Sequence, residues 1–546
     1  MAGRPGVVHR THRDLPRRHT GRRSGAARLD WKCLHRRLDP RSGPCPTSRS
    51  SPSCTYGDSR AAPRGSTTPS RTRSTASTRA RRTCASDRTT SPPSTSSRAP
   101  CCGCISTRGT GSWCRAARRR TWTRTTRSRP TASGSTVFYD ASASTWGTNP
   151  RKFRLEDAAE DLRRLVARLR EKSGAPRVHL VAHSMGGLVC RCLLQKILPE
   201  RGEDPADHVD KFFTYGTPHG GIAFDVGSGL VERLMAATGV AGADVFAPRR
   251  MYEYLTPDAL REDGGPPRGW DPREIPEGRF PPHRVFCLVG TDPTDYDVAH
   301  GLSARAVGAR SDGLVQIDNA QVPHAQRAFV HRSHSGRYGL VNSEEGYQNL
   351  QRFLFGDLRV QAELVGVRLP GEGRGISWQA EVRLAVRGLP GVMHEQLAAH
   401  WCPIQLPRPH GDGSPADPVP LATTFLNSRA PRPPETPTLR YALHLRILSL
   451  RERDGILRFT DHLEQTADFA DILVVDVGSA PQGPGVWAVW NSDLPGAIWE
   501  HRPTGAPCGD EDPRGGVWLA HIPLPATAAP ILGEEASVRL TVTPWS

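Results

Sequence analysis

One serine stands where the chain passes from a strand-like run to a helix-like run. In residues 177–188, RVHLVAHSMGGL, the β-branched and leucine-rich letters before Ser184 are typical of a buried strand, and the letters after it open an apolar helical pattern. Ala182 and Gly186, two before and two after the serine, are small enough for strand and helix to approach closely. Such a sharp turn exposes the hydroxyl beside helix N-terminal N–H groups, which can stabilise an oxyanion. The stretch predicts a nucleophilic serine, with a serine in an ordinary strand-to-helix turn as the alternative.

This motif resembles the nucleophile elbow of the α/β-hydrolase superfamily, in its esterase and lipase branch. The first small residue is usually Gly and here is Ala182, as in bacterial lipases with the form A-x-S-x-G. The motif GTPHGG, at residues 216–221, follows a predicted strand after the elbow helix. Such a loop recurs in bacterial triacylglycerol lipases and in lipases that deacylate glycolipid anchors, where it borders the active-site entrance.

The resemblance implies which residues lie near the substrate. The loop should place His219 in a structural or rim position rather than a catalytic one, since it precedes the expected acid in the chain. The expected substrate-binding residues are His183, Thr217, Pro218 and His219.

A serine hydroxyl needs a histidine to take its proton and a carboxylate to orient that histidine. In α/β-hydrolases the acid and then the histidine follow the nucleophile along the chain. Asp312, in SDGLV, resembles the acid loop of such lipases, and His334, in HRSHSG, follows the strand-like run RAFVH. His331 would be the base instead if that strand ended one residue earlier. The remaining rivals are Asp292 and then Asp297 for the acid, and His324 for the base.

The backbone N–H of Met185, directly after the nucleophile, is the expected oxyanion donor. The resemblance implies a second donor from a loop after an earlier strand, often with a His-Gly sequence. We find no such loop before residue 136. A hydrolase without its first strands would expose a sheet edge and lose about a hundredfold or more in rate with the missing donor.

The elements around these residues alternate between strand and helix. Residues 155–173 predict an amphipathic helix that ends at Gly174, and residues 343–356 predict a helix with Ser343 as its N-cap. This alternation indicates a parallel sheet with helices on its faces. We therefore expect an α/β fold, an α/β-hydrolase core over residues 136–355 that lacks its first strands. Strands besides the one before Ser184 are expected at residues 137–140, 210–215, 284–290 and 327–331.

Residues 222–280 depart from this alternation and predict a cap over the pocket. They contain a candidate apolar helix at 230–235, an aromatic cluster at 251–255 and a tether rich in Pro and Gly. An apolar cap suits a substrate with a hydrophobic arm. An ordinary surface insertion is the alternative.

Residues 356–546 predict a β-rich accessory domain. Short runs with period-two patterning, such as SWQAEVRLAV and ASVRLTV, alternate with turns rich in Pro, Gly and Asp. That pattern favours an antiparallel β-sandwich. The segment contains no catalytic motif, and its role, whether binding a partner or packing on the catalytic domain, is left open.

Residues 1–135 differ in composition from the remainder of the chain. The net charge of +18 arises there: the first 130 residues contain 29 Arg and one Lys against five Asp, and the rest contains 43 basic and 50 acidic residues. Few apolar residues are present, so the segment should be disordered and non-globular. One hypothesis is a GC-rich coding region translated out of frame, which translation of the DNA in the other frames would test. The alternative is a basic nucleic-acid-binding arm; we expect no nucleic-acid partner.

The cysteines indicate neither a disulfide framework nor a metal site. Eight of the 13 lie in the first 135 residues, where Cys101 and Cys104, near Cys102 and Cys114, have incomplete zinc-ligand spacing.

No apolar run is long enough to span a membrane, and no signal-peptide core follows the basic start, unless a frame error conceals one. We expect a cytoplasmic protein.

Together these features predict a serine esterase or lipase that acts on a hydrophobic acyl ester, a lipid or a small molecule, without a cofactor. An acyltransferase with the same three residues, and a non-catalytic binding protein on a hydrolase scaffold, are the alternatives.

Overall fold

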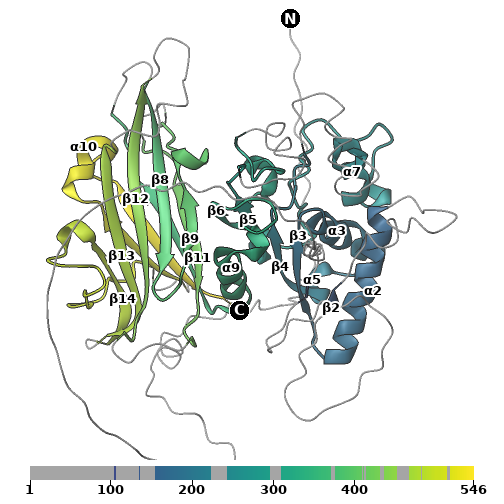
Figure 1. The fold of residues 1–546 in the computed structure, drawn as a ribbon, viewed down its shortest axis with the longest axis horizontal. Coiled ribbons are helices and arrows are strands. Elements are labelled where there is room, and N and C mark those ends of the chain that lie inside the picture. The colour runs from purple at the N-terminus through teal and green to yellow at the C-terminus, as the bar shows by residue number, and fades with distance from the viewer. Residues whose placement is uncertain are drawn as a thin grey trace, which may run out of the picture. The chain divides into compact units, whose positions relative to one another are not determined.

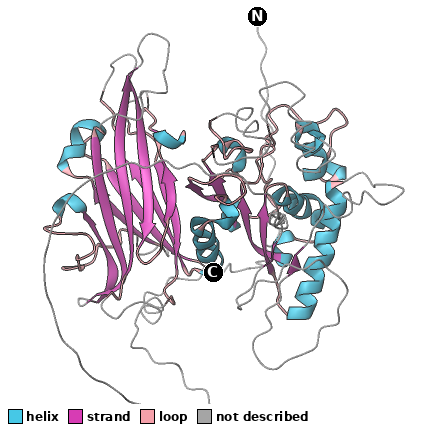
Figure 2. Cartoon of the chain, in the orientation of Figure 1, coloured by secondary structure: helices cyan, strands magenta, loops and turns pink. Residues whose placement is uncertain are grey.

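The computed structural model describes residues 104–105, 134–135, 154–222, 243–294, 309–370, 376–408, 410, 414–430, 436–451, 467–480, 483–512 and 517–545. All of these residues fall within one compact unit. Of the larger sheets, a parallel sheet with helices comes first in the chain, and two antiparallel sheets follow it (Figures 1 and 2).

The parallel sheet has four strands in the order β3-β4-β5-β6. Among the described strands, β3 is at one edge of this sheet and pairs only with β4. The strands are β3 (Val178–His183), β4 (Val209–Tyr215), β5 (Val285–Gly290) and β6 (Gln326–Val330). The helices with them are α2 (Leu155–Ser173), α3 (Gly186–Cys192), a π-helical turn η1 (Leu193–Ile197), α4 (Leu198–Glu200), α5 (Pro205–His208), α7 (Pro248–Leu255) and α9 (Glu344–Phe355).

Both faces of this sheet are buried. Successive side chains of a strand point to opposite faces, so each strand contributes to the core on either side. On β4, Phe212 packs into the core that contains α2, α3 and α7, and Phe213 packs into the core that contains α9. The hydrophobic runs in the sequence therefore belong to strands covered on two sides.

Two predicted helix boundaries are confirmed. Helix α2 ends at Ser173, and Gly174 follows with a φ of 69°, the left-handed conformation that glycine adopts without strain. Helix α9 is capped by Ser343, whose hydroxyl accepts a hydrogen bond from the N–H of Gly346 at 3.0 Å.

The predicted cap segment packs partly into the core. Its described elements are η2 (Ala243–Phe246), α7 and η3 (Asp258–Leu260). The aromatic cluster forms α7, in which Met251, Tyr252, Tyr254 and Leu255 are all buried. An ion pair between Arg250 and Glu156, 2.6 Å apart, links α7 to α2. The candidate helix at 230–235 lies outside the described residues.

The C-terminal part contains two antiparallel sheets that share one hydrophobic core. The first has the order β10-β8-β12-β13-β14, with β9 also paired to β8, and the second has the order β11-β7-β16-β15. Their strands are β7 (Leu358–Val365), β8 (Ile376–Val386), β9 (Val392–Gln396), β10 (Ile404–Gln405), β11 (Val419–Leu426), β12 (Leu439–Arg451), β13 (Phe469–Ala480), β14 (Gly483–Trp490), β15 (Trp518–Pro523) and β16 (Ser537–Pro544). This is the arrangement that the period-two patterning predicts.

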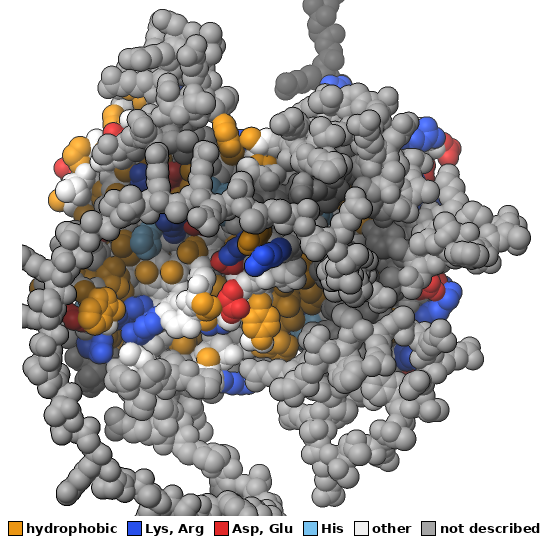
Figure 3. Space-filling view, viewed as in Figure 1, with side chains coloured by type: hydrophobic (Ala, Val, Ile, Leu, Met, Phe, Trp, Pro, Cys, Tyr) orange, Lys and Arg blue, Asp and Glu red, His pale blue; other side chains and the backbone are white. Residues whose placement is uncertain are grey.

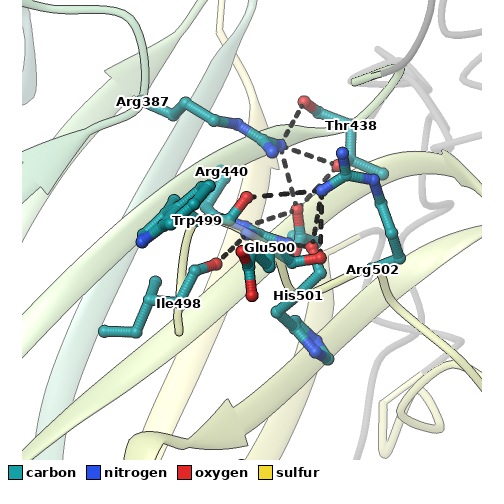
Figure 4. Close-up of polar contacts among 9 residues, drawn as sticks. Arg387, Thr438, Arg440, Ile498, Trp499, Glu500, His501 and Arg502 are labelled. Carbon is teal, nitrogen blue, oxygen red and sulfur yellow. Dashed lines mark hydrogen bonds and ion pairs between the residues drawn. The ribbon is translucent and has the colours of Figure 1, made fainter. Parts of the chain in front are cut away.

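A buried ion pair fixes one loop of the first sheet. Arg440 of β12 bonds Asp476 of β13 at 2.7 Å, and both side chains are almost fully buried. The same guanidinium donates to the carbonyls of Ile498 and His501, at 2.7 and 3.0 Å (Figure 4). These bonds order a loop whose Trp499 side chain is 75% exposed.

The second sheet packs against α9 of the first part. Phe425 of β11 and Trp545 both contact the ring of Phe353, and the indole N–H of Trp545 donates to the Phe353 carbonyl at 2.7 Å. From the first sheet, β9 also contacts α9, because the amide of Asn349 donates to the carbonyl of Met393 at 2.9 Å. The C-terminal sheets thus complete the cover over one face of the parallel sheet.

Little of the arginine-rich segment is described. Two short strands, β1 (Cys104–Ile105) and β2 (Gly134–Ser135), pair antiparallel there. Outside the described residues lie the rest of residues 1–135, the predicted strand at 137–140 and three of the four clustered cysteines. On the face in Figure 3, described Lys and Arg side chains lie among acidic and apolar ones. In the described part of the chain, no helix is long and apolar enough to cross a membrane.

Candidate active site

Ser184 lies in the sharp turn between β3 and α3. Its φ of 53° is unusual for a residue with a side chain, and such strain persists where the surrounding contacts fix it. The N–H of Ser184 donates to the carbonyl of Tyr215 at 2.9 Å, and its carbonyl accepts from Gly187 at 3.0 Å. Ser184 is only partly buried.

A continuous hydrogen-bonded chain joins three of the predicted residues. The Nε2 of His334 is 3.0 Å from Ser184 Oγ, and its Nδ1 is 2.9 Å from Asp312 Oδ2. A carboxylate at Nδ1 fixes the tautomer with its proton on Nδ1, which leaves Nε2 to accept the serine proton. These three residues are brought together from three separate loops.

The loop of Asp312 holds its carboxylate rigidly. Oδ1 accepts hydrogen bonds from the N–H groups of Leu314, at 3.1 Å, and Val315, at 2.7 Å, which leaves Oδ2 for His334. The backbone N–H of His334 also donates to the Asp312 carbonyl at 2.8 Å. The acid and the histidine are therefore connected twice, through side chains and through backbone.

Two glycines at the carboxyl ends of β4 and β5 make room for this pair. A Cβ at Gly216, whose φ is 49°, would lie 2.8 Å from Asp312 Oδ2 and 3.2 Å from His334 Nδ1. A Cβ at Gly290 would lie 2.7 Å from the Cβ of Asp312. The contacts of 2.8 Å at Gly216 and 2.7 Å at Gly290 are shorter than a real Cβ makes, so glycine is needed at both positions.

The rival residues lie elsewhere. The carboxylate of Asp292 accepts hydrogen bonds from the N–H and hydroxyl of Thr294, at 2.9 and 2.6 Å, and His324 is exposed in a turn. His331 stacks on His400 with 3.7 Å between ring centroids. Asp297 lies outside the described residues.

The GTPHGG loop is hydrogen-bonded to the elbow through Thr217. The hydroxyl of Thr217 donates to the carbonyl of Ser184 at 2.9 Å, and a Cβ at Gly187 would lie only 2.1 Å from that hydroxyl oxygen. His219 Nε2 is 3.2 Å from the hydroxyl of Thr214, and burial lowers the pKa of His219 well below its usual value. Thr217, Pro218 and His219 are all buried, and their role as substrate contacts stays a prediction.

Arg191, on the elbow helix, is a fully buried residue that we did not predict. Its guanidinium donates to the backbone carbonyls of His219, Pro272 and Glu274, at 3.2, 2.7 and 2.7 Å. Burial lowers its pKa to about 10, so it is still a cation at neutral pH. An arginine inside the apolar run LVCRCLL is the sequence signal that could have identified it.

His183, which we expected among the substrate-binding residues, contacts the catalytic-histidine candidate, and its substrate role stays a prediction. Its Nε2 is 2.9 Å from the carbonyl oxygen of His334, and the two ring centroids lie 4.8 Å apart.

Met185, the expected oxyanion donor, is the N-cap of α3, directly after the serine. In the part of the chain that the structure describes, no cluster of His, Cys, Asp or Glu could hold a metal ion.

Comparison with known proteins supports the fold of this region. A family model described as alpha/beta hydrolase fold matches residues 114–248, which include the elbow and the GTPHGG loop. The match begins inside the arginine-rich segment, before the predicted start of globular sequence at residue 136. Neither the curated proteins nor the solved structures contain a match. The chain thus has an α/β-hydrolase domain followed by antiparallel β-rich sheets, and the predicted fold class is confirmed.

Proposed function

We propose that this α/β-hydrolase domain is a serine carboxylic-ester hydrolase, an esterase or lipase, in which Ser184, His334 and Asp312 form the catalytic triad. Proteins with this fold are in general hydrolytic enzymes. The observation that carries the proposal is the hydrogen-bonded chain from Ser184 Oγ through His334 to Asp312, with distances of 3.0 and 2.9 Å.

The geometry supports a two-step acyl transfer. Ser184 Oγ attacks the ester carbonyl as its proton passes to His334 Nε2, and Asp312 Oδ2 stabilises the resulting imidazolium. The N–H of Met185 donates to the oxyanion of the tetrahedral intermediate. His334 then protonates the leaving alcohol, and a water molecule activated by the same histidine releases the acid from the acyl-enzyme.

We propose a hydrophobic acyl ester as the substrate class. The segment between β4 and β5 supports this, since it brings apolar side chains to the elbow helix: Met251 and Tyr254 of α7 lie in the same core as Leu188 of α3. The helix that follows the nucleophile thus packs on apolar side chains of this segment, in keeping with the apolar cap that suits an acyl arm.

Fluorophosphonate labelling of the full chain tests the proposal. Wild type should gain one covalent label, located on Ser184 by peptide mass, and should hydrolyse p-nitrophenyl acyl esters. Ser184→Ala should take up no label and lose activity by roughly 10³-fold or more. Ser173→Ala, which changes an α2 serine bonded to the Leu169 carbonyl, is the control and should label as wild type does.

A folded wild-type chain without label or esterase activity would refute the proposal in favour of a non-catalytic scaffold. Label together with acyl transfer to an added alcohol in preference to water would indicate an acyltransferase with the same triad.

A further inference from the structure

His183, the residue immediately before the nucleophile, donates a hydrogen bond to the backbone of His334. Its Nε2 lies 2.9 Å from the His334 carbonyl oxygen. A carbonyl oxygen only accepts hydrogen bonds, so the proton of the neutral His183 ring is on Nε2. This contact connects the end of β3 to a loop 151 residues further along the chain.

With this contact, the backbone N–H and the backbone carbonyl of His334 are both hydrogen-bonded, an arrangement that we call the clamp on His334. Its N–H donates to the carbonyl of Asp312 at 2.8 Å, and its carbonyl accepts from His183. One backbone group of His334 is thus fixed by the acid loop and the other by the elbow strand. Since a displacement of about 1 Å at reacting groups can lower a rate by about a hundredfold, this clamp bears directly on the Ser184–His334 distance.

The electrostatics of His183 suit this position. Burial lowers the pKa of His183 to about 3, so its ring is neutral wherever an esterase of this kind operates. The ring faces His334 with 4.8 Å between the centroids. Because His334 becomes a cation during acyl transfer, a neutral donor at position 183 holds the loop without opposing that charge.

We propose that His183 is a positioning residue for the catalytic histidine: its Nε2–H fixes the His334 backbone so that the imidazole meets Ser184 and Asp312 together. This rests on the proposed function of the triad. It assigns His183 to the catalytic machinery rather than to substrate binding.

Three variants test the role. His183→Leu removes the donor, and His183→Gln restores an N–H close to the position of Nε2. His179→Leu is the matched control, because His179 lies on β3 with its side chain on the same face, and its Nδ1 is 3.6 Å from Asp210 Oδ2, away from the triad.

His183→Leu should lower kcat on the order of tenfold or more, with KM within about twofold of wild type and a shifted pKa in the acid limb of the pH–rate profile. His183→Gln should recover most of kcat, and His179→Leu should retain wild-type kcat. A raised KM with unchanged kcat in His183→Leu would overturn the proposal in favour of a substrate contact. Equal kcat losses in His183→Leu and His179→Leu, or no recovery in His183→Gln, would also overturn the proposal, because His183 would then have only a structural role.

Proton NMR separates failure of this proposal from failure of the proposed function. The His334 Nδ1 proton, shared with Asp312, should give a downfield signal in wild type that shifts or exchanges faster in His183→Leu and returns in His183→Gln. If wild type shows neither fluorophosphonate labelling nor ester hydrolysis, the proposed function fails, and this signal then tests only whether His183 holds the His334–Asp312 hydrogen bond. An unchanged signal in His183→Leu would overturn it.

Discussion

Replacing Gly216 with alanine should impair catalysis without preventing folding. The new Cβ would lie 2.8 Å from Asp312 Oδ2 and 3.2 Å from His334 Nδ1. An ordinary carbon–oxygen contact is longer by roughly half an ångström, so one of the two groups must move. Asp312 cannot easily retreat, because Leu314 and Val315 hold its other oxygen.

The expected loss follows from that displacement. A shift of a few tenths of an ångström should lengthen the His334–Asp312 hydrogen bond and lower kcat by roughly 10- to 100-fold, with KM little changed. The backbone adds a separate cost: the φ of Gly216 is 49°, and alanine in the left-handed region costs about 1 kcal/mol of stability.

Gly174→Ala is the matched control. Gly174 has a φ of 69°, so alanine there carries the same backbone strain, but its Cβ would meet nothing within 4 Å. Urea unfolding should show Gly174→Ala less stable than wild type by about 1 kcal/mol and Gly216→Ala by at least as much, and ester hydrolysis should show a loss only in Gly216→Ala. Wild-type kcat in a destabilised Gly216→Ala, or equal kcat losses in both variants, would refute the reasoning.

Three further predictions concern the surroundings of the site. Thr217→Val removes the donor to the elbow carbonyl and should lower stability by about 1 kcal/mol and reduce kcat, whereas Thr217→Ser should keep both; steady-state kinetics with urea unfolding decides. Arg191→Met leaves three buried carbonyls without their donor and should lower the free energy of unfolding by about 3 kcal/mol or more, a result that a change under 1 kcal/mol would contradict. His219 and His394 are buried with pKa values depressed by desolvation, to about 4 for His394, so below pH 6.5 the unfolded chain binds more protons than the folded one. Lowering the pH from 7 to 5 should therefore reduce the free energy of unfolding, with His394 alone contributing about 2 kcal/mol and His219 acting in the same direction, and His394→Gln should show a correspondingly smaller pH dependence.

The elbow could be predicted from the sequence because it is a local structure. A strand, a sharp turn and a helix follow one another within residues 177–188, and the small residues that the turn requires lie within two positions of Ser184. Helix α2 was predictable for the same reason, since its apolar stripe and its terminal glycine are adjacent in the chain.

The choice between His331 and His334 could not be made from strand length. We expected a strand ending at Val330, one residue earlier than RAFVH indicates, to favour His331 as the base. Strand β6 does end at Val330, yet His334 is the histidine whose ring reaches Ser184. The reason is tertiary: the loop after β6 turns back so that the His334 backbone bonds Asp312 and His183, whereas His331 stacks on His400 of the C-terminal part.

The role of the β-rich segment was likewise beyond the sequence. Period-two patterning predicted its strands, but not that Phe425 and Trp545 would pack on Phe353 of α9. Such contacts join residues far apart in the chain, and no local pattern encodes their partner.

The sequence by itself determined the local chemistry of this protein: a hydroxyl on a strained strand-to-helix turn, a glycine-rich loop after the next strand, and candidate acids and histidines in the required order. Only the tertiary structure decided which of them meet. Distances of 3.0 Å and 2.9 Å among Ser184, His334 and Asp312 depend on strands that align side by side and on glycines that leave space between them. The cause is physical: hydrogen bonds and van der Waals contacts act over a few ångströms of space, whatever the separation along the chain.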